Sequence, residues 1–529
     1  MFIKKKAKSN ISKFQKGLLD RLRNDDEHIV AVADKGLGPV WVETPRYIKD
    51  ALVHLSNPET YQIISEAQGF RDSWALKWKI FEWTIEHRKA LSKQEVAFIR
   101  KKLEKAMDEP FGYFYLLYKL HKTPISTRPV CSDCGSLPHA LGQWVDEQLQ
   151  PIVQAQETYI KDSFSFKSEI SKLELPPNAS IFTYDAISMY TNINTDDCIK
   201  RITEFLKNPA SKKRFVHYNT SALVEALILV MKNNRMRFGD LLVKQLMGIA
   251  MGMSPAPTIA NLFVAIHEAA AILRFVGIFL LWLKRFIDDG FGIWLHDPDP
   301  TVDDANWETF NATINSGGLK WTFSPRGKKV VFLDMIVEIV GNKLETALYH
   351  KPQALHLYLP PNSCHAPGVL YGLICGMTLR IHSLCSRAQD VEAELVSLFR
   401  CLVDRGHQAS GLIPLFAKAI ANAKTYLAQD PAFRARKKQE KLESSRRRVF
   451  LHLPYHPQNP SSREIQVLWR GLVSDPALKT PLNWIENYNG NRIPIDQLVI
   501  AYSRPPNLSN MFSYRKICKL SGPKVSSYL

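Results

Sequence analysis

The sequence predicts an α+β fold, because strand-like and helix-like segments are both present and each has its own period. Runs rich in aromatic and β-branched residues, broken by Gly, Pro or Asp, indicate strands, for example at 111–122, 181–184 and 495–502. Apolar residues three and four apart, as at Ile199, Ile202 and Leu206, indicate amphipathic helices. A length of 529 residues sets a prior of roughly two to four domains.

The first segment, 1–105, is expected to be a basic N-terminal extension. Residues 1–23 hold eight Lys and Arg, and apolar residues recur at helical spacing from Ile11 to Leu22. This pattern predicts a basic amphipathic helix. Such a helix either docks on the protein with a solvated charged face or contacts nucleic acid, and both interpretations stay open. Near residue 100 the pattern changes to shorter, strand-like segments.

The charge of the chain favours a polyanionic partner. Lys and Arg number 69 against 51 Asp and Glu, so the formal net charge is +18. Nucleic acid is the first expectation and an anionic membrane surface the second. The most apolar stretch, 269–283, has 15 residues and contains Arg274, and a bilayer crossing needs about 20. We therefore expect a buried helix or strand run there and no membrane partner. Few, mostly isolated cysteines and no recognisable signal peptide predict an intracellular, nuclear location.

Acidic residues follow strand-like runs at two places in the sequence. Asp185 ends the run 181–184, and Asp288 and Asp289 lie between two apolar runs, with Gly290 permitting a turn. A single Asp at a strand end is more often a helix cap or a surface charge. Adjacent carboxylates between apolar flanks repel each other, however, so a cation should compensate them.

A divalent metal fits this requirement. Mg²⁺ binds one or two protein carboxylates and completes its shell with water and substrate phosphates. Two such ions about 3.5 to 4 Å apart can stabilise the attacking and leaving oxygens of a nucleotidyl transfer. Asp185 and Asp288 are 103 residues apart, so the site exists only if the fold pairs the two segments.

Two other segments are candidates for substrate contacts. Gly248 and Gly252 allow close backbone approach before a helix that begins near Pro255, although an ordinary loop and helix is the competing interpretation. Lys122 and Arg128 lie in a strand, loop, strand pattern and could bind phosphate, although a generic basic hairpin is equally compatible.

The remaining patterns concern a hairpin, a basic run and a cysteine pair. Segment 330–351 alternates between apolar and polar residues around the two-residue turn Gly341-Asn342, which predicts a β-hairpin. Segment 434–448 has eight Lys and Arg and scarcely an apolar residue, so we expect an exposed linker or a nucleic-acid contact. Cys131 and Cys134 form one CxxC, but no second ligand pair with zinc-site spacing accompanies it.

Taken in order, these segments resemble the reverse transcriptases of Penelope-like retroelements. The similarity runs from about residue 30 to the C-terminus, over blocks at 33–42 (ADKGLGPVWV), 115–151, 182–193 (FTYDAISMYTNI), 248–263 (GIAMGMSPAPTIANLF), 285–294 (RFIDDGFGIW), 332–339, 349–372 and 501–516.

The resemblance implies a right-hand polymerase that uses two Mg²⁺ ions, which Mn²⁺ could replace. Asp185 corresponds to the first metal-binding Asp, with the Ala186 carbonyl as an additional ligand. Asp288 and Asp289 correspond to the paired acids, of which Asp288 is expected to bind metal directly. Tyr190 corresponds to the aromatic residue beneath the incoming sugar, which excludes a 2′-hydroxyl.

Further roles follow from the same resemblance. Lys122 and Arg128 correspond to triphosphate contacts of the fingers, and Gly252 to the loop that approaches nucleotide and template. Lys328 or Lys329 is the expected general acid for pyrophosphate, and the hairpin 330–351 matches the region that grips the primer.

The sequence also departs from the family pattern. Met253 and Ala256 stand where the family usually has serines, which puts full activity in question. Many relatives carry a GIY-YIG endonuclease after the polymerase, whereas this sequence contains no such block, so we expect no DNA-nicking activity.

Together these observations predict an RNA-directed DNA polymerase of a retroelement, whose partners are an RNA template, a DNA primer and deoxynucleoside triphosphates. Two alternatives remain: a nucleic-acid-binding protein that has lost catalysis, motivated by Met253 and Ala256, and an RNA-dependent RNA polymerase, opposed by Tyr190. The expected domains after the extension are fingers and palm at 106–345, a helical thumb at 346–430, a basic linker at 431–448 and an accessory segment at 449–529.

Overall fold

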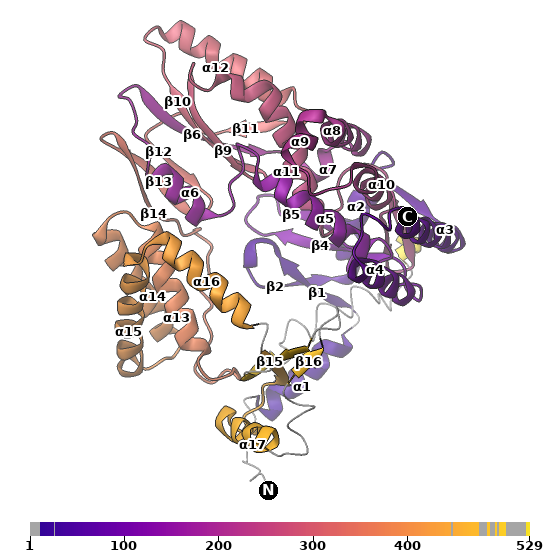
Figure 1. The fold of residues 1–529 in the computed structure, drawn as a ribbon, viewed down its shortest axis with the longest axis vertical. Coiled ribbons are helices and arrows are strands. Elements are labelled where there is room, and N and C mark those ends of the chain that lie inside the picture. Colours follow the sequence, from indigo (N-terminus) through magenta and orange to yellow (C-terminus); the bar gives the residue numbers. More distant parts are fainter. Residues whose placement is uncertain are drawn as a thin grey trace. The chain divides into compact units, whose positions relative to one another are not determined.

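The computed structural model describes residues 11–25, 27–445, 448–474, 484–486, 492–494, 497–503 and 525–528. The chain divides into two compact units (Figure 1). The larger unit comprises Asp25–Ala354 and Phe512–Leu529, and the smaller one comprises Met1–Asn24 and Leu355–Met511.

A seven-stranded sheet in the larger unit joins strands from residues 28–64 to strands from residues 112–245. Its order is β2-β1-β4-β7-β8-β3, and β5 pairs with β4 off this path. Residues 25–105, which fall within the expected N-terminal extension 1–105, contribute three strands to this sheet. The pairing of β1 with β4 is parallel and joins residues 85 positions apart, Val32 and Leu117, which no local pattern reveals. The strands are β1 (His28–Ala33), β2 (Pro39–Glu43), β3 (Tyr61–Ile64), β4 (Gly112–Lys119), β5 (Ser126–Ser132), β7 (Arg235–Phe238) and β8 (Leu241–Gln245).

A second sheet has four strands in the order β11-β6-β10-β9. Strands β6 and β10 are antiparallel, and Gly290 lies opposite Tyr184. A Cβ atom at Gly290 would lie 2.1 Å from the Tyr184 ring, so only glycine allows this ring to cross the neighbouring strand. The strands are β6 (Ala179–Ala186), β9 (Leu280–Phe286), β10 (Asp289–Leu295) and β11 (Trp321–Phe323).

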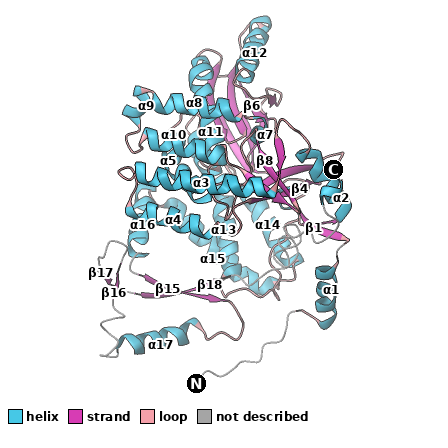
Figure 2. Cartoon of the chain, turned by 90° about the vertical axis from the view of Figure 1, so that its right-hand side faces the viewer, coloured by secondary structure: helices cyan, strands magenta, loops and turns pink. Residues whose placement is uncertain are grey.

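Helices pack beside these strands, and Figure 2 shows α3, α5, α8 and α10 stacked together. In α8, Asn194 caps the helix by accepting a hydrogen bond from the Asp197 N–H at 2.9 Å. The predicted apolar face is confirmed, because Ile199, Ile202 and Leu206 are buried. The helices of this unit are α2 (Thr44–Leu55), α3 (Glu66–Glu86), α4 (Lys93–Lys105), α5 (His139–Gln154), α6 (Ser163–Ile170), α7 (Met189–Asn192), α8 (Thr195–Lys207), α9 (Pro209–Arg214), α10 (Thr220–Met231), α11 (Ala256–His267) and α12 (Pro300–Asn315).

The apolar stretch 269–283 is a helix end, a loop and the start of a strand, and not the single buried helix or strand run that we expected, because Val276 and Ile278 of the loop are exposed. Helix α11 continues as a π-turn at Glu268–Ile272 and a 3-10 turn at Leu273–Phe275, and β9 begins at Leu280. By length and composition Ala256–Phe275 could cross a membrane, but 61% of its apolar window is buried inside the protein, as in the core helix of a globular domain.

The predicted hairpin is also present. Strands β12 (Lys329–Phe332), β13 (Met335–Val340) and β14 (Lys343–Leu348) form a three-stranded sheet. Val340 pairs with Lys343, so Gly341 and Asn342 form the two-residue turn, and Gly341 has φ +61°.

The smaller unit is largely helical in its described part. The expected basic linker forms a helix, α16, as far as Ser445, and a strand begins at Arg448. Arg446 and Arg447 lie outside the described residues. The elements are α1 (Lys13–Asn24), α13 (Val369–Leu384), α14 (Ala388–Asp404), α15 (Ala409–Ala428), α16 (Pro431–Ser445), α17 (Ser462–Ser474), a parallel pair β15 (Arg448–Pro454) and β18 (Gln497–Ser503), and an antiparallel pair β16 (Trp484–Glu486) and β17 (Arg492–Pro494).

Candidate active site

The fold brings the two acidic segments together. Asp185 is the penultimate residue of β6, Asp289 is the first residue of β10, and the two are direct partners across the antiparallel pair. Asp288 lies in the turn from β9 to β10, where its backbone carbonyl accepts a hydrogen bond from the Ala186 N–H at 3.0 Å. The preceding residue, Ile287, has φ +56°, so a tight, left-handed turn presents Asp288. The expectation that segments 103 residues apart are paired is therefore confirmed.

These carboxylates repel one another and lack a compensating cation in contact. Burial and then the charge of Asp288 raise the pKa of Asp185, against the opposing effects of Lys35, Lys122 and Arg128. Burial is also the main cause that raises the pKa of Asp289 to about 7, although the Leu333 N–H opposes it. In the part of the chain that the structure describes, no Lys, Arg or His nitrogen lies within 4.0 Å of Asp185, Asp288 or Asp289.

A divalent cation fits this arrangement. Asp185, Ala186 and Asp288 line the same cavity, whereas Asp289 does not and its Oδ2 lies 3.4 Å from the Leu333 nitrogen. The carboxylates of Asp185 and Asp288 and the Ala186 carbonyl are hard oxygen donors of the kind that Mg²⁺ prefers. Asp185 and Asp288 would hold the metal, which when bound supplies positive charge beside a reacting phosphate.

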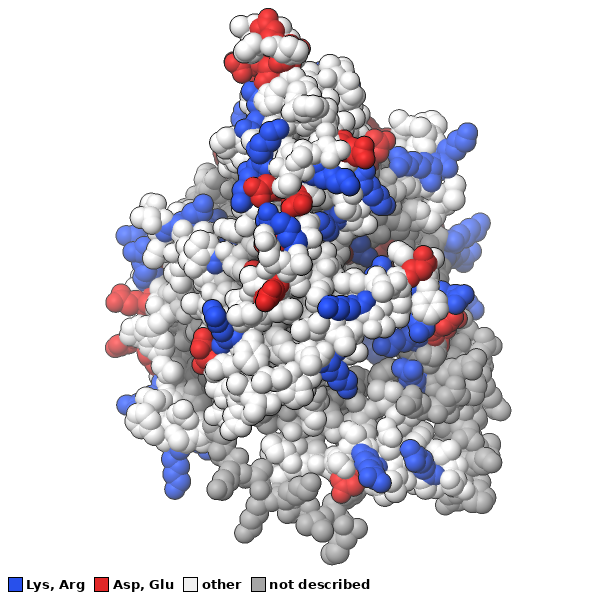
Figure 3. Space-filling model, turned by 90° about the vertical axis from the view of Figure 1, so that its left-hand side faces the viewer, with Lys and Arg blue, Asp and Glu red and all other residues white. Residues whose placement is uncertain are grey.

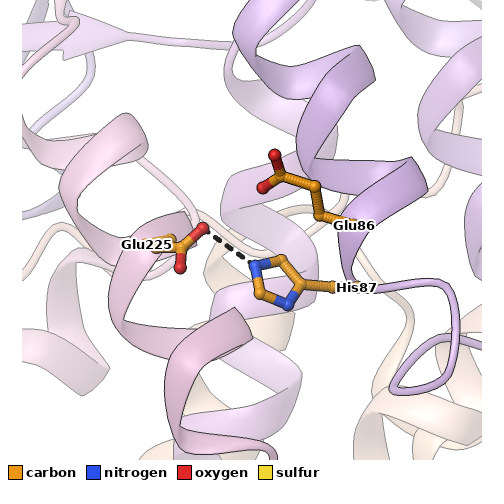
Figure 4. Close-up of side chains that lie close together, drawn as sticks. All are labelled: Glu86, His87 and Glu225. Atoms are coloured by element: carbon orange, nitrogen blue, oxygen red, sulfur yellow. Dashed lines mark hydrogen bonds and ion pairs between the residues drawn. The ribbon is translucent and has the colours of Figure 1, made fainter.

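A different cluster has the tightest grouping of potential ligand atoms among the described residues. Atoms of Glu86, His87 and Glu225 lie within 4.8 Å of one another. His87 donates through Nε2 to the Glu225 carboxylate at 2.8 Å, and Figure 4 shows the His87 ring pointing at that carboxylate. Because this histidine already has its partner and both glutamates are exposed, the cluster is a surface ion pair.

The cavity has a volume of about 690 Å³, and basic side chains line it together with the carboxylates. Lys119, Lys122 and Arg128, from the β4–β5 hairpin, line it together with Lys35. On the face drawn in Figure 3, Lys and Arg are spread among Asp and Glu without forming one patch. On this face the distribution of charge therefore marks no binding site, whereas the cavity brings cations and carboxylates together.

Tyr190, on α7, lines the same cavity. Burial and the nearby charge of Asp288 raise its pKa to about 12. The neutral ring thus lines the cavity that contains Asp185 and Asp288, and its predicted place beneath an incoming sugar stays a prediction.

Gly252 supports the site without lining the cavity. It has φ +110°, and a Cβ atom there would lie 2.8 Å from the Cys131 carbonyl oxygen of β5. The Cys131 N–H donates to the Met251 carbonyl at 2.7 Å. The glycine loop therefore docks on the basic hairpin, and contact with nucleotide or template stays a prediction. Cys131 is buried while Cys134 is exposed, so the CxxC does not present two thiols to one site.

The two residues that depart from the family pattern are core residues here. Met253 is 3% exposed and Ala256 is 1% exposed. Their side chains contribute to packing below the loop and not to the wall of the cavity.

The expected general acids lie elsewhere, which corrects that prediction. Lys328 donates to the Ala179 carbonyl at 2.7 Å, at the opposite end of β6 from Asp185. Ala179 and Asp185 are six residues apart along β6, which corresponds to about 20 Å. Lys329 lies 3.8 Å from Glu338 on the neighbouring strand. Strand pairing of β12 with β13 fixes both lysines away from the cavity.

The sequence argument missed Asp34 and Lys35. Asp34 is buried, and its Oδ2 lies 3.4 Å from Arg128 Nη2, so it orients that guanidinium. Lys35 has φ +58°. The sequence Asp-Lys-Gly after a strand-like run could have indicated a turn with charged residues. It could not have indicated that this turn lies beside β4.

Comparisons with known proteins identify the fold. A scan against known protein families finds no match, and no curated protein matches the sequence. The solved structure of telomerase from Candida albicans, in complex with a fragment of telomeric RNA, has a TM-score of 0.51 at 11% identity and covers 79% of this chain and 70% of that chain. Apo telomerase from Candida tropicalis (TM-score 0.44, 9% identity, covering 77% and 71%) and the RNA-dependent RNA polymerase of a sicinivirus (0.36, 9%, 61% and 71%) are more distant. With the geometry above, the first of these likenesses shows that the chain has an α+β right-hand polymerase fold.

Proposed function

We propose that this protein is an RNA-directed DNA polymerase of a Penelope-like retroelement. It adds deoxynucleotides to the 3′-end of a DNA primer on an RNA template, with two Mg²⁺ ions bound at Asp185 and Asp288. An intracellular, nuclear location belongs to the same proposal.

One observation carries the proposal: Asp185 and Asp288 line one cavity together with Lys and Arg side chains, none of which contacts either carboxylate. A metal–nucleoside triphosphate complex is positive where it meets carboxylates and negative where it meets Lys and Arg, so it matches both kinds of group. Polymerase chemistry depends mainly on positioning and charge stabilisation, which these groups can supply.

The choice of deoxynucleotide rests on Tyr190. Its ring lines the cavity close enough to Asp288 for that charge to affect its pKa. A bulky ring beside the metal-binding carboxylate would occupy the space that a 2′-hydroxyl needs. The burial of Met253 and Ala256 also weakens the case for a catalytically inactive protein, because neither side chain reaches the cavity.

Primer extension by the purified full chain tests the proposal. We expect extension with deoxynucleotides and Mg²⁺ on an RNA template, and a loss of at least about a thousand-fold in Asp288→Asn, because a metal contributes several kcal/mol to the transition state. Asp304→Asn, at an exposed acid on α12, is the matched control and should extend normally.

Three outcomes would contradict the proposal. Preference for ribonucleotides would identify an RNA polymerase. No extension by the wild type, with primer–template still bound, would identify a binding protein. Full activity in Asp288→Asn would place the metal site elsewhere.

A further inference from the structure

A strained loop beside the basic hairpin adds a cation to the cavity. Strand β1 runs parallel to β4, with Ala33 opposite Tyr118, and the loop of Asp34, Lys35 and Gly36 follows directly. The Ala33 N–H donates to the Gly38 carbonyl at 2.9 Å, which closes the loop. This pairing places the loop at the end of β4 that leads into the basic hairpin.

Lys35 occupies a conformation that lysine rarely adopts. Its φ is +58° and its ψ is +27°, a left-handed region that favours Gly or Asn. If the loop needed only the turn, glycine would provide it with less strain. Strained residues of this kind cluster at functional sites, where the surrounding structure holds them in place.

The neighbours of Lys35 are themselves fixed. Asp34 is buried, accepts a hydrogen bond from the Lys35 N–H at 3.0 Å and pairs with Arg128 through its other oxygen. Lys35 itself is exposed and, among the described residues, has no acidic partner within 4.0 Å. The charge of Asp34 is thus paired with that of Arg128, and among the described residues the ammonium group of Lys35 has no acidic partner.

This cation belongs to the cavity that holds the carboxylates. Lys35 lines the cavity together with Asp185 and Asp288. Lys122 and Arg128 of the basic hairpin line it as well. A polyanion bound in this cavity would therefore lie within reach of Lys35 as well as of the hairpin cations.

We propose that Lys35 is a third phosphate-binding residue of this site, contacting the outer phosphates of the incoming deoxynucleoside triphosphate and the pyrophosphate product. This inference rests on the proposed function. Lys122 and Arg128 are the other two cations, and the buried Asp34 positions Arg128 relative to Lys35.

Three substitutions separate charge from backbone conformation. Lys35→Gln removes the charge and keeps a polar, unbranched-stem side chain that is one atom shorter, Lys35→Arg keeps the charge, and Lys35→Gly removes the charge while suiting the positive φ. Lys200→Gln, at an exposed lysine on α8 outside the cavity, is the matched control. Thermal unfolding checks that each variant is folded.

Steady-state extension on an RNA template gives the first measurement. We expect Lys35→Gln and Lys35→Gly to raise KM for deoxynucleotide about ten-fold or more, as the loss of a charged contact implies. The kcat should stay within about three-fold and Lys35→Arg should recover most of the affinity. The inhibition constant of inorganic pyrophosphate should rise by a similar factor.

Binding of Mg²⁺–dTTP to the complex with a dideoxy-terminated primer, measured by calorimetry, gives a readout that needs no turnover. The Kd should rise in Lys35→Gln and not in Lys200→Gln. Unchanged KM and Kd in Lys35→Gln would overturn the inference. A normal Lys35→Gly protein would also overturn it, because the position would then matter only for the turn. Weaker primer–template binding with unchanged KM would assign Lys35 to the nucleic-acid backbone and likewise overturn it.

The proposed function fails separately. It requires extension by the wild type and its loss in Asp288→Asn, and neither result depends on Lys35.

Discussion

Two acidic residues near the end of β9, Glu268 and Asp288, have opposite electrostatic environments. Glu268 and Arg285 are 0% and 2% exposed and form an ion pair with Nε–Oε1 at 2.7 Å. The Thr158 hydroxyl donates to the other Glu268 oxygen at 2.6 Å. Three residues after Arg285, Asp288 lines the cavity, and among the residues that the structure describes no cation contacts it.

The difference separates a structural role from a binding role. A buried charge needs a partner and hydrogen bonds, and Glu268 has both. Arg285 also donates to the Ile287 carbonyl at 2.6 Å, so the neutralised pair supports the turn that presents Asp288. Glu268 is thus neutralised by Arg285, which supports the turn. Asp288, which the turn presents, has no counter-charge in contact among the described residues and is available to bind a metal.

The largest effect we expect is on stability at the paired site. Glu268→Gln should lower the free energy of unfolding by about 3 to 5 kcal/mol, because it leaves Arg285 buried without its counter-charge. Asp288→Asn should leave that free energy within about 1 kcal/mol or raise it, because it removes repulsion on Asp185. Denaturant unfolding of both variants measures the contrast. The double variant Glu268→Gln/Arg285→Met should recover part of the loss, and equal destabilisation of the two single variants would remove the distinction.

The pH dependence of stability tests the unpaired site. Because the pKa of Asp289 is raised to about 7, the folded protein keeps this proton after the unfolded chain has lost it. The stabilising contribution is complete below about pH 4 and is lost as the pH rises through about 7. Asp289→Asn should therefore remove a decline of up to about 1.4 kcal/mol per pH unit in this window. Unfolding at several pH values measures the slope, and an identical slope in wild type and variant would contradict the assignment.

The sequence predicted the site of Asp185, Asp288 and Asp289 better than it predicted the ion pair of Glu268 with Arg285. Strand-like runs that end in acids, with Gly290 beside them, locate Asp185, Asp288 and Asp289 at strand ends, because this signal is local. The ion pair flanks the apolar stretch 269–283, and only the fold places the end of α11 against β9. Nothing in the spacing of 17 residues indicates that Glu268 and Arg285 meet.

Long-range pairing limited the rest of the prediction in the same way. The hairpin turn at Gly341-Asn342 was predictable, because two residues determine it. The parallel pairing of β1 with β4 was not, so the loop with Lys35 was left outside the site. Lys328 and Lys329 were chosen by their order in the sequence, but Lys328 lies at the far end of β6 from Asp185 and Lys329 pairs with Glu338 on β13.

Sugar selection gives a smaller expected effect at the open site. Tyr190→Ala should reduce discrimination against ribonucleotides by about ten-fold or more, because the ring lines the cavity near Asp288. Tyr190→Phe is the matched control and should keep the discrimination, since it retains the ring. The ratio of kcat/KM for deoxy- and ribonucleotide measures the effect. An unchanged ratio in Tyr190→Ala would remove the steric role and revive the RNA polymerase alternative.

The smallest effect is expected at the third acidic group, Glu86, His87 and Glu225, which resembles a metal site only by proximity. Burial raises the pKa of Glu225, but hydrogen bonds with His87 and Ser221 outweigh it and hold that pKa below its usual value, the opposite direction from Asp185 and Asp289. A lowered pKa marks a carboxylate whose charge is already satisfied, so the group gains little from a cation. Glu225→Gln should change the free energy of unfolding by less than about 1 kcal/mol, as for exposed ion pairs, and should leave both Mn²⁺ binding by calorimetry and primer extension unchanged. Mn²⁺ binding lost in Glu225→Gln but kept in Asp185→Asn would show that the direction of the pKa shift does not distinguish a metal site from a surface ion pair in this protein.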